Sequence, residues 1–108
     1  MMKKVYISMS IKGKSPDKIE IDKQFLLRLC SVSIHEPVEI IERKIDIDNE
    51  NIYMDLFGEN IKNMSEADYV IFADGYSKDK ICNMEFYIAS NFYKTILFEH
   101  GNKLKGVS

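Results

Sequence analysis

Tyr69-Val70-Ile71-Phe72-Ala73 is the strongest strand signal in this sequence. The run is continuously apolar, and the turn residues Asp74 and Gly75 follow it directly. Continuous apolar runs of this length are typical of strands that are buried on both faces, as in parallel sheets. We therefore predict a central parallel strand at residues 69–73 and build the rest of the fold around it.

The remaining sequence alternates between strand and helix patterns. Ser15 and Pro16 form a helix start signal, and Pro37 limits the helix that follows them. The polar stretch from Arg43 to Asn51 is interpreted as a loop, and residues 101–106 as a loose tail. We expect further strands at residues 5–8, 38–41 and 95–98. The second helix is marked by Ile52, Leu56, Phe57, Ile61 and Met64, and the third, from about Ile81 to Tyr93, carries Cys82, Phe86, Ala89 and Phe92 on one face.

This βαβαβαβ order predicts an α/β fold in one domain, residues 1–108. Right-handed crossovers make it a small doubly wound (flavodoxin/Rossmann-like) parallel sheet of four to five strands with helices on both faces. Ligands bind such sheets beyond the carboxyl ends of the strands, near the point where strand order reverses. That rule selects the loops after Ser8 and after Ala73.

Composition excludes several classes of protein. The chain has 108 residues, a net charge of −2 and 45% hydrophobic residues, which argues against disorder and against a nucleic acid polymer as partner. No apolar run approaches the about 18–20 residues of a membrane span, and no signal peptide is evident. Cys30 and Cys82 lie far apart and form no Cys-x-x-Cys motif. We expect a cytoplasmic protein without membrane association.

No sequence pattern calls for a metal or a cofactor. The loop after the first strand has neither Gly-x-Gly-x-x-Gly nor a Walker lysine pattern. The acidic run from Asp46 to Glu50 lacks the glycine of a calcium loop. His35 and His100 are isolated, and we interpret both as surface or packing residues.

Two carboxylates near the third helix stand out. Asp79 lies just before this helix and Glu85 lies six residues later, in its second turn. Such a pair can divide the roles of nucleophile and general acid in glycoside chemistry. The alternative is a helix N-cap at Asp79 and a solvated side chain at Glu85.

Three segments together resemble a known family. They are Val5 to Gly13, Asn60 to Val70, and Asp74-Gly75-Tyr76 through Cys82 to Glu85. In order and spacing they are similar to the opening strand, the helix-to-strand junction and the Gly-Cys-x-x-Glu segment of the nucleoside 2-deoxyribosyltransferase-like superfamily. This superfamily includes deoxynucleoside 5′-monophosphate N-glycosidases.

The resemblance implies cleavage or transfer of an N-glycosidic bond through a covalent glycosyl-enzyme. Glu85 matches the nucleophile, Asp79 the acidic residue beside the base, and Tyr6 a tyrosine that orients the nucleophile. The resemblance further implies a nucleoside or nucleotide as ligand and a homo-oligomer that completes the pocket. Its expected substrate-binding residues are Ser8 and Asn60 at the sugar, Ser10, Lys12 and Gly13 at a 5′-phosphate, and Gly75 and Tyr76 elsewhere in the pocket.

The sequence also departs from the family pattern. Asn60 replaces an aspartate, Met9 and Ser10 replace a glycine and a proline, and Ile81 replaces a glycine. An amide is not a proton donor of comparable acidity, although it still forms hydrogen bonds. These changes motivate a second hypothesis, a non-catalytic nucleotide-binding or sequestering protein on the same fold. An interaction domain with a vestigial pocket is a third.

Overall fold

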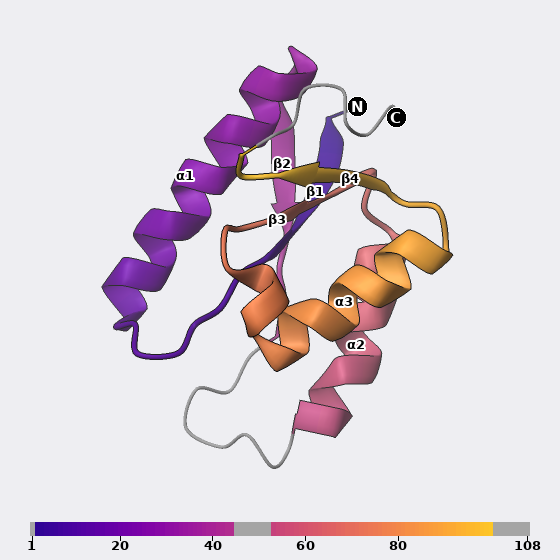
Figure 1. Cartoon of the computed structure of the whole chain (residues 1–108). Coiled ribbons are helices and arrows are strands. Elements are labelled where there is room, and N and C mark those ends of the chain that lie inside the picture. The colour runs from indigo at the N-terminus through magenta and orange to yellow at the C-terminus, as the bar shows by residue number, and fades with distance from the viewer. Residues whose placement is uncertain (1, 45–52, 101–108) are drawn as a thin grey trace.

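A four-stranded, all-parallel sheet forms the centre of the fold in the computed structural model, which describes residues 2–44 and 53–100 (Figure 1). The strand order is β2-β1-β3-β4. The α/β class predicted from the sequence is therefore confirmed. The elements are β1 (Lys3–Ser8), α1 (Pro16–Ile34), β2 (Val38–Ile41), α2 (Tyr53–Ser65), β3 (Tyr69–Phe72), the short 3-10 helix η2 (Tyr76–Lys78), α3 (Lys80–Asn91) and β4 (Thr95–Phe98).

Strand order reverses between β1 and β3. From β1 the chain passes through α1 to β2 on one side, and then through α2 to β3 on the other. The two central strands pair in register, with Tyr6 beside Val70 and Ser8 beside Phe72. Their carboxyl ends therefore meet at one edge of the sheet. The loops after Ser8 and Ala73, which the sequence analysis selected as the candidate ligand site, therefore lie where strand order reverses.

Helices cover both faces of the sheet, with α1 on one face and α2 and α3 on the other (Figure 1). Successive strand residues point to opposite faces. Val5 and Ile7 of β1 pack in the cluster under α1, whereas Tyr6 packs with Val70 and Phe72 in the cluster under α2 and α3. Both clusters are buried, which explains why residues 69–73 are continuously apolar.

The helix ends agree with the sequence signals at α1 and differ at α3. The Ser15 hydroxyl oxygen accepts a hydrogen bond from the Lys18 N–H (3.1 Å), as a cap before Pro16 should. The predicted end of the third helix at Tyr93 is two residues late. Phe92, expected on its buried face, is 74% exposed. Phe92 already follows the last helical residue, where helical periodicity no longer sets the direction of the side chain.

Part of the sequence prediction falls on undescribed residues. The expected loop over residues 43–51 is described only at Arg43 and Lys44, and Ile52 and the tail lie outside the described residues. Within residues 2–44 and 53–100, no helix is both long and apolar enough to cross a membrane.

Candidate functional site

Glu85 lies at the centre of the candidate site. Its side chain is fully buried although it is a carboxylate, so the solvated side chain considered as an alternative is wrong. The Tyr6 hydroxyl donates to Glu85 Oε2 at 2.6 Å, and the Ser8 hydroxyl donates to Oε1 at 2.7 Å. Tyr6 and Ser8 are two residues apart in β1 and therefore face the same helix layer. The structure thus brings together three residues that the resemblance implied.

Arg43 completes the surroundings of this carboxylate. Its Nη2 lies 3.0 Å from Glu85 Oε1, and its Nε–H donates to Oε2 at 3.3 Å. Its Nη1 donates to the Met9 carbonyl oxygen at 2.6 Å. The guanidinium therefore joins the end of β2 to the loop after β1 and to α3. A bidentate pair of this kind is geometrically specific.

Arg43 was not predicted as a site residue, because it begins a polar stretch that was interpreted as a loop. One feature of the sequence could have indicated this residue. Arg43 follows a strand that runs parallel to β1, and the carboxyl ends of parallel strands lie at the same edge of the sheet. A cation two residues beyond such a strand therefore lies close to the predicted ligand site.

Asp79 caps α3. Its Oδ1 accepts the Cys82 N–H at 2.9 Å, so the N-cap interpretation is confirmed. Burial raises the pKa of Asp79, but hydrogen bonds from Cys82 and the Ser10 hydroxyl and the charge of Arg43 together outweigh it and lower the pKa below its usual value. Asp79 is therefore an anion at neutral pH and acts as a hydrogen-bond acceptor.

Cys82 lies one helical turn before Glu85 and is fully buried. Burial raises the pKa of the Cys82 thiol to about 11 although Arg43 is nearby. Arg43 Nη2 donates to its Sγ at 3.7 Å. Because the thiolate is the nucleophilic form of cysteine, Cys82 is not poised for nucleophilic attack at neutral pH.

The loop after β1 contains the three residues expected at a 5′-phosphate. The Lys12 N–H donates to the Ser10 hydroxyl oxygen at 3.4 Å, while Gly13 adopts a φ of 73° that favours glycine. Ser10 also reaches Asp79, which ties this loop to the start of α3. Phosphate binding by these residues stays a prediction.

Asn60 is buried on α2 and holds the backbone of Lys44. Its Oδ1 accepts the Lys44 N–H at 2.6 Å, and its Nδ2 donates to the Lys44 carbonyl oxygen at 2.9 Å. This amide anchors the chain directly after Arg43. A contact from Asn60 to a sugar stays a prediction.

Gly75 and Tyr76 form the turn after β3. Gly75 has a φ of 83°, which permits the turn into η2. The Tyr76 ring lies 5.2 Å from the ring of Phe72 and 5.2 Å from that of Phe86, measured between centroids. Tyr76 is therefore part of an aromatic cluster behind the site. Its role as a substrate contact stays a prediction.

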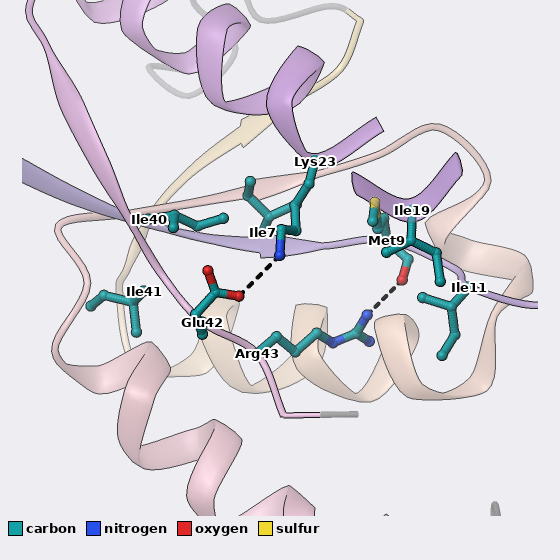
Figure 2. A pocket seen from close by; sticks show the side chains of 9 residues that line it. All are labelled: Ile7, Met9, Ile11, Ile19, Lys23, Ile40, Ile41, Glu42 and Arg43. Carbon is teal, nitrogen blue, oxygen red and sulfur yellow. Dashed lines mark hydrogen bonds and ion pairs between the residues drawn. The ribbon is translucent and has the colours of Figure 1, made fainter. Parts of the chain in front are cut away.

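A small cavity adjoins Arg43 between α1 and the ends of β1 and β2 (Figure 2). Its volume is about 40 Å³, well below the about 300–1,000 Å³ of typical ligand pockets. Lys23 lies at its wall and pairs with Glu42 at 3.0 Å. The cavity is thus too small for a nucleoside. Its other lining residues are Ile7, Met9, Ile11, Ile19, Ile40 and Ile41.

His100 is exposed, as predicted for a surface residue, but two acidic residues lie beside it. Its Nδ1 lies 2.6 Å from Asp74 Oδ2 at the carboxyl ends of β3 and β4. Glu99 adds a third group, and one potential ligand atom from each residue lies within 4.8 Å of the others. Exposed groups commonly gather in this way without an ion, so we assign no metal to them. His35 is exposed and ends α1 in the left-handed conformation.

The site therefore consists of a buried carboxylate, held by two hydroxyls and a guanidinium, at the reversal point of a parallel sheet. A carboxylate oriented in this way can attack an electrophilic carbon once one of its oxygens is uncovered. Compared with known proteins, the chain matches no family model, no curated protein and no solved structure.

Proposed function

We propose that this chain cleaves or transfers the N-glycosidic bond of a deoxynucleoside or its monophosphate, with Glu85 as the nucleophile. The observation that carries the proposal is the 2.6 Å hydrogen bond from the Tyr6 hydroxyl to the fully buried Glu85 carboxylate. A hydroxyl at this distance fixes the orientation of a carboxylate, as a nucleophile requires.

The reaction proceeds in two displacements. A Glu85 oxygen bonds to the anomeric carbon C1′ while the bond from C1′ to the base nitrogen breaks. The nitrogen keeps the electron pair and takes up a proton from water. In the second step, water attacks C1′, loses a proton and releases Glu85, or the nitrogen of a second base takes the place of water.

Asp79 has a different role from that of a proton donor. Because its pKa lies below the usual range, it is ionised at neutral pH. An ionised carboxylate only accepts hydrogen bonds. In this mechanism Asp79 therefore orients donor groups of the base, and the proton for the leaving base comes from solvent.

Base release tests the proposal directly. The purified protein is incubated with the four deoxynucleosides and their monophosphates, with and without a free acceptor base, and the products are separated by chromatography. We expect base release that Glu85→Gln abolishes and that Glu66→Gln, at an exposed glutamate, preserves. Absence of release from every substrate, or release unchanged in Glu85→Gln, refutes the proposal.

One observation favours a second candidate, a non-catalytic nucleotide-binding protein. The Glu85 carboxylate is fully buried and paired with Arg43, so in this conformation it offers no oxygen to a substrate. Calorimetry distinguishes the two functions. Saturable nucleotide binding without base release supports the second candidate, whereas absence of binding contradicts it.

A further inference from the structure

Arg43 occupies every position on Glu85 that Tyr6 and Ser8 leave available. A carboxylate offers about four lone-pair positions, two on each oxygen. Oε1 takes the Ser8 hydroxyl and Arg43 Nη2, and Oε2 takes the Tyr6 hydroxyl and Arg43 Nε. The acceptor capacity of Glu85 is therefore saturated. A new bond to carbon requires that one of these donors leaves.

Arg43 is the donor that the fold constrains least. Tyr6 and Ser8 are fully buried on the central strand β1, where other protein atoms surround their hydroxyls. Arg43 instead follows the edge strand β2, and its side chain is 10% exposed. Four rotatable side-chain bonds allow its guanidinium to turn away while the backbone stays in place.

The structure keeps that backbone in place. Asn60 binds both the N–H and the carbonyl oxygen of Lys44, directly after Arg43. Figure 2 shows the Arg43 side chain reaching along the wall of the small cavity to the Met9 carbonyl. Opening is thus a side-chain rotation, and the contacts that it breaks include those to Glu85, Met9 and Cys82.

An anion is the partner that can replace these contacts. A guanidinium taken from a carboxylate without compensation loses a strong, charge-assisted interaction. Phosphate restores it because two of its oxygens match the guanidinium fork. An uncharged ligand offers no such replacement and leaves the guanidinium on Glu85.

We propose that Arg43 is an inhibitory latch on Glu85, which opens when an anionic group, such as a phosphate, binds its guanidinium. The latch rests on the proposed function in so far as it takes Glu85 as the nucleophile. It deepens that function, because a deoxynucleoside that carries a phosphate opens the latch and an uncharged deoxynucleoside does not.

Arginine side-chain NMR tests the opening without any catalysis. The sequence has two arginines, Arg28 and Arg43, so a ¹⁵N spectrum contains two Nε–Hε signals that single variants assign. Titration with inorganic phosphate or a deoxynucleoside monophosphate should shift the Arg43 signal to saturation. The exposed Arg28 serves as the internal reference. The latch is refuted if the Arg43 signal does not move, if Arg28 moves equally, or if uncharged deoxynucleosides shift Arg43 as much.

Kinetics of Arg43→Met provide the second test. Removing the latch should raise kcat/KM for uncharged deoxynucleosides and lower it for monophosphates, so that their ratio changes by about tenfold or more. Arg28→Met is the matched control and should leave the ratio unchanged. A purely structural role of Arg43 lowers both values together, which overturns the latch. Should Arg43→Met not fold, Arg43→Lys keeps the charge without the fork and should still reduce the preference for monophosphates.

The two proposals fail separately. If neither the wild type nor any variant releases base but phosphate shifts the Arg43 signal, the glycosidic function is wrong and the anion response stands. If base is released while neither the signal nor the substrate ratio responds, the function stands and the latch is wrong.

Discussion

Glu85→Gln should destabilise the protein strongly, because it leaves a buried cation without its counter-charge. The Arg43 side chain is 10% exposed, and Glu85 is fully buried. Removing one partner of a buried ion pair costs about 3–5 kcal/mol. The glutamine oxygen still accepts from nearby donors, so we expect a loss of about 3 kcal/mol in the free energy of unfolding, at the lower end of that range.

A variant of this kind should remain folded and measurable. A domain of this length has a total stability of about 5–15 kcal/mol. At about 4–8 °C per kcal/mol, the expected loss lowers Tm by about 12 °C or more. The chain contains no tryptophan, so urea unfolding is best followed by circular dichroism.

A double-mutant cycle isolates the ion pair from the other effects of each change. Arg43→Met and Glu85→Gln are measured separately and together. Because the combined variant buries no unpaired charge at these two positions, its loss should fall short of the sum of the single losses by about 2 kcal/mol. Glu66→Gln controls for the loss of a surface charge. Additive losses, or a loss below about 1 kcal/mol in Glu85→Gln, would refute the buried ion pair.

Three further predictions concern Asp79, the two buried cysteines and Asn60. Asp79→Ala removes the cap of α3 and should cost about 1 kcal/mol in urea unfolding. Burial alone raises the pKa of Asp79, but the Cys82 N–H and other partners have the larger, opposite effect, so the net pKa lies below its usual value. Wild type should therefore lose stability below the usual aspartate pKa, as pH falls through the lower folded value, and the variant should lack this contribution. Burial raises the pKa of Cys30 and Cys82 to about 11, so both thiols should resist iodoacetamide at neutral pH until urea unfolds the chain. Since unfolded thiols titrate first, near 9.0, stability should fall from there up to about pH 11. Asn60→Ala loses two hydrogen bonds to Lys44 and should lower the free energy of unfolding by about 2 kcal/mol; a loss below about 0.5 kcal/mol contradicts that anchoring.

The fold could be predicted from the sequence because its main elements are marked by local residue patterns. Residues 69–73 and the cap at Ser15 depend on local chemistry, namely β propensity and the satisfaction of a helix N–H. The alternation of strands and helices then implied the parallel sheet. The error at Phe92 has the same origin, since periodicity holds only while the helix continues and α3 ends at Asn91.

The candidate site could be predicted only in part. The positions of Tyr6 and Glu85 followed from the resemblance, and the structure places them in contact. The burial of Glu85 did not follow from the local pattern, because an isolated glutamate on a helix is usually solvated. Its burial depends on donors from β1 and from the end of β2, far apart in the sequence. Only the assembled sheet brings Arg43 to the same edge.

Stability does not explain why an arginine and a glutamate are buried here. Buried ion pairs contribute little net stability, since apolar residues of similar volume are often as stabilising or more so. Such a pair is therefore weak evidence for a structural role, and it lies where parallel sheets bind ligands. The proposed latch gives this pair a chemical role. Arg43 covers the Glu85 carboxylate until an anion binds the guanidinium, and the carboxylate then becomes available to a substrate. The double-mutant cycle measures the Arg43–Glu85 contact while it is formed, and the phosphate titration measures whether an anion breaks it.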